Sequence, residues 1–371
     1  MKHIVHMTSV HQRYDVRIFL KECTSLAEAG YKVTLIVADG LGDEVKNNVN
    51  IIDVGGKQQH GRIWRMLNST KLIYKAAVDC NADAYHFHDP ELIPIALKIK
   101  NSGKVVFFDS HENFADDIKD KPYLHPLISG AVSWAYRRYE KYAVNKFDGV
   151  IAATPSIRDY FRGMQVNSID INNYPFQEEF CFDSSQEGID YKYDVAYIGA
   201  ISRIRGVHEL VDSLSYSTKY SMVMAGSVNE PNFMTLLESS PGWRQVDFKG
   251  QVSRQEIKEI LSTSKVGVVT FLPAPNHIES QPNKMFEYMS AGLPIVGSHF
   301  PLWKIIIEGN ECGICVDPSS PKSIYDAIDF ILSNPEKAKV MGENGRRAII
   351  AKYNWSAESK KLIDIYNSLT W

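Results

Sequence analysis

The residues with the clearest chemical meaning lie between Glu279 and Glu287, in the stretch ESQPNKMFE. We expect a helix to begin here, because Ser280 is a good N-cap residue and Pro282 suits a first helical turn. The free backbone N–H groups at a helix start bind phosphate. Two carboxylates therefore flank a predicted phosphate site, although such a pair taken alone is also explained as solvated charges beside a helix.

Carboxylates suit the hydroxyl groups of sugars, because each oxygen can accept a charge-assisted hydrogen bond. One of the two glutamates would hold a ribose and the other a transferred sugar. Gly292 and Pro294 then end the helix in the order expected of a C-terminal cap, after which an apolar strand pattern resumes. The predicted helix is short and well delimited.

A second group of residues is the loop GAISRIRG, from Gly199 to Gly206, which follows an apolar strand pattern. Guanidinium groups bind diphosphate through two parallel hydrogen bonds and stay charged at any working pH. Arg203 and Arg205 are therefore candidates for neutralising a leaving diphosphate. Solvated surface arginines are the alternative explanation.

Histidines follow two further strand patterns. His111 comes after the strand KVVFF, where its ring could donate a hydrogen bond to a phosphate or a sugar hydroxyl. A buried histidine with its hydrogen bonds satisfied is the alternative. His86 and His88 have the i, i+2 spacing that points two side chains to one side of a strand, so a metal site is a further alternative there.

Basic and aromatic residues alternate in two segments, His60–Lys75 and Trp134–Lys146. Amphipathic helices of this kind can lie at an anionic membrane surface. An ordinary helix with one face in the core is the alternative for each segment. A polar loop with His11, Arg13, Asp15 and Arg17 follows the first strand.

Strand patterns and helix patterns alternate through both halves of the chain, and these elements position the residues described above. This alternation predicts an α/β fold with two doubly wound, Rossmann-like parallel-sheet domains. Ligands bind beyond the carboxyl ends of the strands in such sheets. The pattern stops between Ile171 and Tyr193, which predicts the domain boundary. The strand patterns start at His3, Lys32, Ala84, Lys104 and Gly149, then at Asp194, Tyr220, Arg244, Lys265 and Pro294.

The composition excludes some classes of protein. The chain has 371 residues, 44% of them hydrophobic, which is enough for two cores. Its formal net charge of −3 gives no bulk attraction for nucleic acid. Five scattered cysteines do not form the disulfide framework of a secreted domain, and no long apolar run predicts a membrane span. We therefore expect a cytoplasmic protein.

The sequence resembles the retaining glycosyltransferases of the GT-B fold, in particular the large family four. In that family a Glu-x7-Glu motif ends in a helix that is followed by a small-Gly-Leu-Pro-Val/Ile run, as in ESQPNKMFEYMSAGLPIV here. The N-terminal half resembles a subgroup common in bacterial polysaccharide assembly, through HQRYDVRIFLKECTSLAEAGYKVTLI, FHDPELIPIAL and FDSHEN.

The resemblance implies roles for individual residues. Glu287 would bind the ribose hydroxyls, Glu279 would contact the donor sugar and His111 would lie beside the diphosphate. The family carries an arginine where this chain has Ala200, and Arg203 is a candidate replacement for it. The expected catalytic residues are Glu279, His111 and Arg205, and the expected donor-binding residues are Gly199, Arg203, Gly206, Ser280, Asn283, Lys284 and Glu287.

The resemblance also implies the activity. The expected reaction moves a sugar from a nucleoside diphosphate sugar to a hydroxyl of a glycan or a lipid-linked saccharide, with retention and without a metal or a cofactor. Residues 1–175 would form the acceptor-side domain and residues 192–352 the nucleotide-sugar domain, facing a central cleft. The acceptor side would begin in the polar loop from His11 to Arg17. Residues 353–371 would pack back on the first domain, and peripheral membrane contact is a further expectation.

Two other functions remain as alternatives. A sugar-nucleotide epimerase of the same fold shares the two domains but needs no acceptor. A non-catalytic subunit of a polysaccharide assembly complex would bind nucleotide and transfer nothing.

Overall fold

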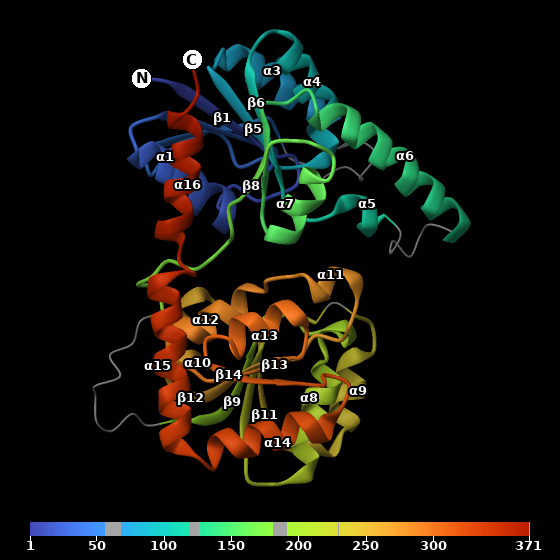
Figure 1. The fold of residues 1–371 in the computed structure, drawn as a ribbon, viewed down its shortest axis with the longest axis vertical. Helices are drawn as coiled ribbons and strands as arrows, with labels where there is room; N and C mark the ends of the chain where they lie inside the picture. The colour runs from blue at the N-terminus through green and yellow to red at the C-terminus, as the bar shows by residue number, and fades with distance from the viewer. Residues whose placement is uncertain (56–67, 119–125, 181–190, 229, 371) are drawn as a thin grey trace. The chain divides into compact units, whose positions relative to one another are not determined.

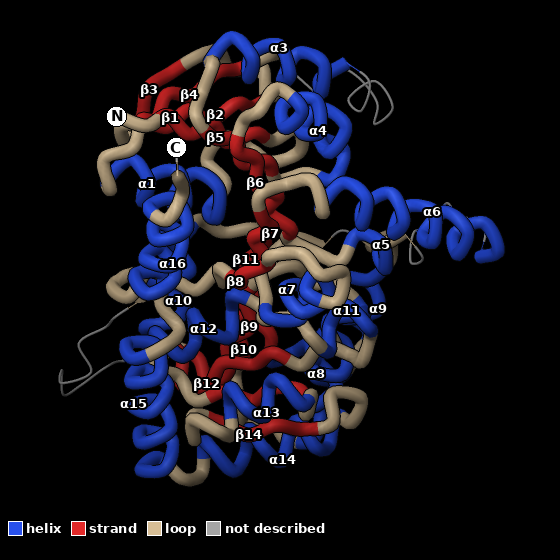
Figure 2. The backbone as a smooth tube through the Cα atoms, turned by 45° about the horizontal axis from the view of Figure 1, so that its top comes forward, coloured by secondary structure: helices blue, strands red, loops and turns tan. Residues whose placement is uncertain are grey.

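The computed structural model describes residues 1–55, 68–118, 126–180, 191–228 and 230–370. The chain divides into two units (Figure 1). Met1–Asn173 and Ala357–Trp371 form the first, and Tyr174–Ser356 forms the second. The final helix therefore groups with the N-terminal part of the chain. Each unit is a sheet with helices, so the predicted α/β class with two Rossmann-like units is confirmed (Figure 2).

The first unit contains an eight-stranded sheet in the order β3-β4-β2-β1-β5-β6-β7-β8. Neighbouring strands pair in parallel, except that β3 and β4 are antiparallel. The chain adds strands first on one side of β1 and then on the other, so a topological switch point lies between β1 and β5. The strands are β1 His3–Met7, β2 Lys32–Val37, β3 Glu44–Lys46, β4 Val49–Asp53, β5 Ala84–Phe87, β6 Val105–Ser110, β7 Gly149–Ala152 and β8 Ser168–Asp170. The helices are η1 Val16–Cys23, α1 Thr24–Glu28, α3 Thr70–Cys80, η4 Pro90–Leu92, α4 Ile93–Asn101, α5 Phe114–Asp117, α6 Pro126–Val144, α7 Pro155–Arg162 and α16 Trp355–Asn367.

The second unit contains a six-stranded parallel sheet in the order β11-β10-β9-β12-β13-β14. Its switch point lies between β9 and β12. The strands are β9 Tyr193–Ile198, β10 Met222–Ala225, β11 Val246–Gly250, β12 Ser264–Val269, β13 Ile295–Ser298 and β14 Gly313–Val316. The helices are η5 Arg203–Arg205, α8 Val207–Ser213, η6 Leu214–Tyr216, α9 Phe233–Ser239, η7 Pro241–Gln245, α10 Arg254–Ser262, α11 Pro275–Ile278, α12 Asn283–Ala291, α13 Pro301–Ile307, α14 Pro321–Leu332 and α15 Pro335–Ala351.

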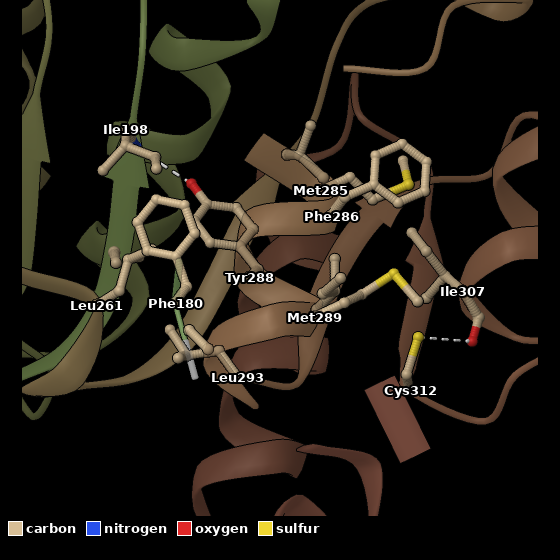
Figure 3. Close-up of a cluster of buried hydrophobic side chains, with 14 of the residues drawn as sticks. Phe180, Ile198, Leu261, Met285, Phe286, Tyr288, Met289, Leu293, Ile307 and Cys312 are labelled. Atoms are coloured by element: carbon tan, nitrogen blue, oxygen red, sulfur yellow. Dashed lines mark hydrogen bonds between the residues drawn. The ribbon is translucent and has the colours of Figure 1, made fainter. Parts of the chain in front are cut away.

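Both faces of the second sheet are buried. Successive residues of a strand point to opposite faces, so Ala196 and Ile198 join one hydrophobic cluster while Val195 and Tyr197 join another. The first cluster includes Met285, Phe286, Tyr288 and Met289 of α12, which Figure 3 shows packed beneath the strands. A helix with this much buried surface has a fixed position on the sheet.

A hydroxyl group ties α12 to the switch point. The Ile198 N–H donates to the Tyr288 hydroxyl at 3.1 Å (Figure 3), and that hydroxyl donates to the Val268 carbonyl at 3.3 Å. Tyr288 is fully buried and therefore bridges the ends of β9 and β12. The polar residues of α12 are thereby held at the switch point of the second sheet.

The contact between α12 and β12 depends on a glycine, and this gives a first prediction. A Cβ atom at Gly267 would lie 2.4 Å from the Tyr288 ring, which is buried and cannot move aside. We expect Gly267→Ala to lower the free energy of unfolding by about 1–3 kcal/mol, measured by thermal unfolding. Gly130→Ala on α6 is the control, because nothing lies within 4 Å of its added Cβ. Equal melting temperatures for the two variants would contradict this packing.

Candidate functional site

The loop after β9 is shaped by close backbone contacts at the switch point of the second unit. Gly206 has a φ of +66°, and a Cβ there would lie 1.8 Å from the Thr270 carbonyl oxygen. Gly226 has a φ of +155°, and its Cβ would lie 1.9 Å from the Gly199 carbonyl oxygen. Both positions require glycine, because another residue would be strained and would also clash. The loop is thus drawn against the ends of β10 and β12.

The helix α12 begins later than the sequence suggested. Ser280 was expected to be its N-cap, but the helix starts at Asn283 and Pro282 is the N-cap residue. Ser280 instead closes the preceding turn α11, where both its backbone N–H and its hydroxyl donate to the His277 carbonyl, at 3.1 and 2.8 Å. The prediction was wrong because Ser280 satisfies its own hydrogen bonds within that turn. The first N–H groups of α12 still have no acceptor inside the helix.

Lys284 is the most unusual residue of this region. It lies in the first turn of α12 and is only 6% exposed. Its ammonium group has no hydrogen-bond partner in the part of the chain that the structure describes, and it lies 3.6 Å from the centre of the Tyr197 ring. Burial, and then the positive charge of Arg205, hold the pKa of Lys284 well below its ordinary value. A charge in this state lacks a counter-ion.

The space beside Gly199 is filled by Lys284. A Cβ at Gly199 would lie 3.1 Å from the Lys284 Cε and 3.2 Å from its Nζ. The lysine stem therefore lies against the start of the loop, next to Ala200. Lys284 thus places a basic group beside Ala200, the position at which the sequence resemblance implied an arginine.

The two arginines of the loop differ in their surroundings. Arg205 is half-buried over the Phe271 ring at 5.1 Å, and its charge acts on Lys284. Arg203 is exposed over the Phe233 ring at 5.5 Å, and its backbone N–H donates to Glu230 at 3.0 Å. The structure therefore brings Arg205 into electrostatic contact with Lys284, whereas the surroundings of Arg203 are those of a surface residue.

The two glutamates of the motif also differ. Glu279 follows α11 and is exposed. Glu287 is 7% exposed, and its Oε1 accepts a hydrogen bond of 2.5 Å from Arg254. Arg254 bridges to Glu179 as well and lies 4.5 Å from the Phe180 ring. The Arg254 contact therefore orients Glu287 through its Oε1.

Sequence reasoning missed two residues near the same strand end. Thr270 follows β12 directly, is fully buried, and its hydroxyl has no hydrogen-bond partner among the described residues. The His277 Nδ1 lies 3.1 Å from the Leu272 carbonyl, and burial lowers the pKa of this histidine. Their position just after a strand adjoining the switch point is the signal that could have identified them.

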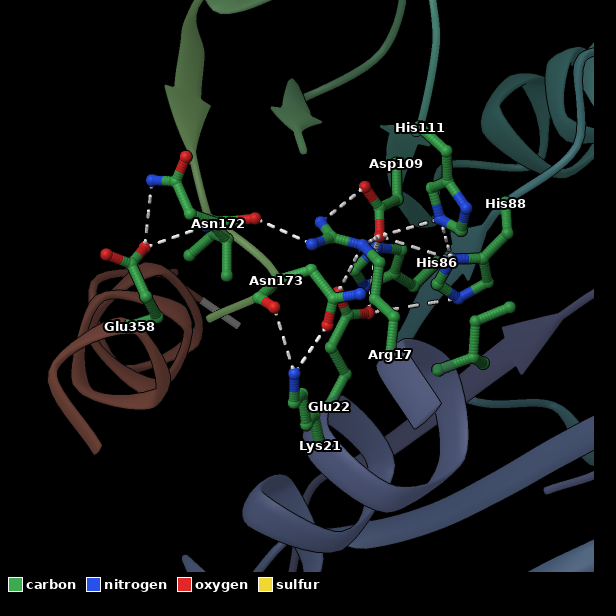
Figure 4. A network of polar contacts seen from close by, with 12 residues as sticks. Arg17, Lys21, Glu22, His86, His88, Asp109, His111, Asn172, Asn173 and Glu358 are labelled. Atoms are coloured by element: carbon green, nitrogen blue, oxygen red, sulfur yellow. Dashed lines mark hydrogen bonds and ion pairs between the residues drawn. The ribbon is translucent and has the colours of Figure 1, made fainter. Parts of the chain in front are cut away.

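His111 lies in the first unit, after β6. Its ring nitrogen Nε2 lies 3.2 Å from the His88 Nδ1 and 3.4 Å from the Asp109 Oδ2. The His111 side chain is 20% exposed, whereas His88 and Asp109 are buried. His111 therefore forms the accessible end of a buried polar network, which Figure 4 shows.

The polar loop after β1 is used mostly inside the first unit. Arg13 pairs with Asp39 and Glu44, and the buried Arg17 donates twice to Asp109, at 3.0 and 2.8 Å. Neither arginine is free to bind an acceptor. His11 lies 3.4 Å from Asp15 and stays half-exposed, so of the loop residues predicted for the acceptor side it is more accessible than Arg13 and Arg17.

The second unit brings Lys284, Arg205, the start of α12 and the buried carboxylate Glu287 to the switch point of a Rossmann-like sheet. Comparison with known proteins identifies the family. The family model for glycosyl transferases group 1 matches residues 182–348, and that for glycosyltransferase family 4 matches residues 16–172. The chain is a group 1 glycosyltransferase of the family 4 type, with the GT-B fold.

Individual relatives are distant in sequence but similar over their whole length. The chain is 24% identical to an uncharacterised glycosyltransferase of Methanocaldococcus jannaschii, over 93% of this chain and 92% of that protein. A sucrose-phosphate synthase from Thermosynechococcus elongatus has a TM-score of 0.79 at 16% identity, covering 99% of this chain and 98% of its own. The Anabaena protein HepE in complex with UDP and glucose has a TM-score of 0.75 at 13% identity, with complete coverage of both chains.

The buried charge of Lys284 gives a second prediction. We expect Lys284→Met to raise the melting temperature of the ligand-free protein at pH 7, because the variant buries no unpaired charge. Each kcal/mol gained in the free energy of unfolding should raise the melting temperature by about 2–4 °C. The folded-state pKa is lowered, so the unfolded state binds more protons from that pKa up to the ordinary value of 10.5. The free energy of unfolding of the unchanged protein therefore rises with pH over this range. The difference in melting temperature between Lys284→Met and the unchanged protein should shrink toward pH 10.

The control for this prediction is Lys322→Met, which removes an exposed lysine on α14 of the same unit. Its melting temperature should stay within about 1 °C of the starting protein, because surface ion pairs contribute little. A Lys284→Met variant that melts below the starting protein at pH 7 would show that the ammonium group already has a favourable partner.

Proposed function

We propose that the chain transfers a sugar from a nucleoside diphosphate sugar to a hydroxyl of a glycan or lipid-linked saccharide, with retained anomeric configuration and without a metal ion or cofactor. The observation that carries this proposal is the unpartnered Lys284 ammonium beside Arg205 at the end of β9. Two cations and the start of a helix together suit a diphosphate.

In the proposed reaction the bond between the anomeric carbon and the diphosphate oxygen breaks, and a bond from the acceptor oxygen to the same carbon forms. The leaving diphosphate gains negative charge, which Lys284, Arg205 and the N–H groups of Asn283 and Lys284 stabilise. Such preorganised groups contribute several kcal/mol. A phosphate oxygen takes the acceptor proton, so no side-chain nucleophile is needed. The cations do the work that a divalent metal does in other transferases.

The remaining site residues take the roles that the family resemblance implies. Glu287, oriented by Arg254, accepts hydrogen bonds from the ribose hydroxyls. Glu279 contacts the donor sugar, with Ser280 beside it, and His111 is a further donor contact. Gly199 and Gly206 keep the loop close to the strand ends. Arg203 is exposed and is the weakest of these assignments.

The subgroup that the N-terminal half resembles supports bacterial surface polysaccharide synthesis as the setting. Product analysis with and without an acceptor separates this function from a sugar-nucleotide epimerase, which needs none. Retention is read from the anomeric configuration of the product by NMR.

Peripheral membrane contact is the other part of this proposal. Among the described residues, no helix is long and apolar enough to cross a membrane. The helix α6 nevertheless exposes Ile128, Trp134 and Tyr142, with Arg138 lying 5.3 Å from the Trp134 ring. Aromatic and basic residues on one helix suit an anionic lipid surface. The other basic segment, His60–Lys75, falls partly outside the described residues.

Donor binding gives a third prediction. In a thermal-shift panel of UDP, GDP, CDP and ADP, one nucleotide should stabilise the protein by about 2.7 kcal/mol at 100 times its Kd. Lys284→Met and Arg205→Ala should each weaken that binding by about 10- to 100-fold, because each removes a charge-assisted contact. Lys322→Met should bind normally. Failure of all four nucleotides to stabilise the protein at millimolar concentration would contradict the proposed donor class.

Transfer itself gives a fourth prediction. Glu279→Ala and Arg205→Ala should each abolish sugar transfer, measured as product formed from donor and acceptor, while the melting temperature stays within a few degrees. The exposed position of Glu279 makes a stability effect small. Glu238→Ala, at another exposed glutamate, is the control. Near-normal turnover in either site variant would remove that residue from the site.

Membrane contact gives a fifth prediction. In sedimentation with vesicles of phosphatidylcholine and phosphatidylglycerol, exchanging both Arg138 and Lys141 for alanine should weaken binding about 30-fold, because each basic group contributes about 1 kcal/mol. The same double change at Lys337 and Lys339 of α15, which are also exposed, should have no effect. Equal binding of both double variants would rule out α6 as the contact.

A further inference from the structure

A buried polar cluster lies at the switch point of the first sheet, apart from the anion site. The side chains of β1 and β5 alternate, so Val5, Met7, Tyr85 and Phe87 join the hydrophobic cluster on one face. His6 and His86 are direct neighbours in the parallel register and do not belong to that cluster. The two imidazole rings lie 4.3 Å apart, and both are fully buried.

A third histidine and a glutamate complete this cluster. The His88 Nε2 lies 3.0 Å from the His6 Nδ1. Glu22 enters from η1, where it is fully buried, and points toward His86 and His88 (Figure 4). Its Oε2 is almost equidistant from three nitrogens, at 3.9 Å from His6 Nδ1, 3.9 Å from His86 Nε2 and 4.0 Å from His88 Nε2. One side-chain atom from each residue thus surrounds a common point.

Several of these atoms lack hydrogen bonds. Of the four atoms that converge, the Glu22 Oε2 and the His86 Nε2 have no hydrogen-bond partner in the described part of the chain, whereas the His6 Nδ1 and the His88 Nε2 bond to each other. The Glu22 Oε1 and the outer nitrogen of His6, Nε2, are without a hydrogen-bond partner among the described residues as well. Each unsatisfied buried polar group costs about 1–3 kcal/mol. Native proteins rarely keep several such groups in one place, and an ion is one of the explanations when they do.

Arg17 is a positively charged neighbour of Glu22. Arg17 lies 3.1 Å from the Glu22 Oε1, but its hydrogen bonds go to Asp109 and to the Ile171 carbonyl. Burial, followed by the charge of Asp109, raises the pKa of Glu22 well above its ordinary value. Burial also lowers the pKa of His6, His86 and His88.

We propose that His6, Glu22, His86 and His88 bind a divalent transition-metal ion, for which Zn²⁺ is the best fit. Imidazole and carboxylate ligands suit Zn²⁺ in a four-coordinate tetrahedral site. Ligand atoms of such a site lie about 3.3 Å apart, given Zn–N distances of about 2.0–2.1 Å. The four ligand atoms lie within 4.8 Å of one another, with 3.0 Å between His6 and His88 and 3.9 to 4.0 Å from Glu22 to the three histidines, so the side chains would move closer together around the ion. The ion displaces the Glu22 proton on binding.

The groups around the cluster fit the same proposal. Ligating histidines usually bond through their second nitrogen to a carboxylate or another polar group. The His88 Nδ1 lies 3.2 Å from the Asp109 Oδ2, and the His86 Nδ1 lies 2.9 Å from the Tyr366 hydroxyl of α16. The ion would therefore link β1, η1 and β5 and, through Tyr366, anchor the final helix. With four protein ligands the site is closed, so its role is structural, and His88 links it to His111 at 3.2 Å.

The experiment measures zinc in the full-length chain purified from cells grown with added zinc. Elemental analysis should find about one zinc per chain. Glu22→Gln and His86→Gln should each lower this content at least tenfold, and removal of zinc by a chelator should lower the melting temperature of the unchanged protein. Co²⁺ added to the zinc-free protein should give the intense visible absorption of a tetrahedral site.

His3→Gln is the matched control, because this histidine lies on the same strand and bonds to Thr34 at 2.9 Å, outside the cluster. It should keep a full zinc content. If a ligand variant fails to fold, zinc and Co²⁺ binding by the unchanged protein still test the site. The proposal is overturned if equimolar Zn²⁺ does not raise the melting temperature of the zinc-free protein and Co²⁺ does not give the spectrum of a tetrahedral site. The four residues would then share protons with one another and bind no metal.

Discussion

The account depends on a charge that the protein itself does not neutralise. Lys284 is buried in the first turn of α12, its ammonium group has no hydrogen-bond acceptor among the described residues, and Arg205 adds a second positive charge nearby. Such an arrangement costs stability in the ligand-free protein. This buried charge is useful only if an anion binds beside it. A diphosphate supplies more than one negative charge.

Close backbone packing fixes the loop after β9 beside that buried charge. Gly199, Gly206 and Gly226 allow the loop after β9 to contact the ends of β10 and β12, while Tyr288 holds α12 by hydrogen bonds to both sides of the switch point. The group 1 glycosyltransferase family provides this frame. In this chain the side chain of Lys284 lies against Gly199, at the start of that loop.

Much of this could be predicted from the sequence. Apolar runs separated by amphipathic segments predicted the α/β class, and the longer strands lie where those runs are. The strands β3, β4, β8 and β14 were missed; β3 and β8 have three residues each with a single apolar one, and β4 and β14 are only five and four residues long. The sequence predicted that Lys284 offers its backbone N–H. The contact between its side chain and Gly199 depends on the tertiary structure and could not be predicted. The pairing of β1 with β5 likewise makes His6 and His86 neighbours, and no local sequence pattern predicts that contact.

The most direct test of the central claim is a crystal structure of the chain with the nucleoside diphosphate that it binds. The account predicts phosphate oxygens within hydrogen-bond distance of the Lys284 Nζ and near Arg205, with the ribose hydroxyls at Glu287. A bound nucleotide whose phosphates lie elsewhere, with the Lys284 ammonium still unpartnered, would contradict it.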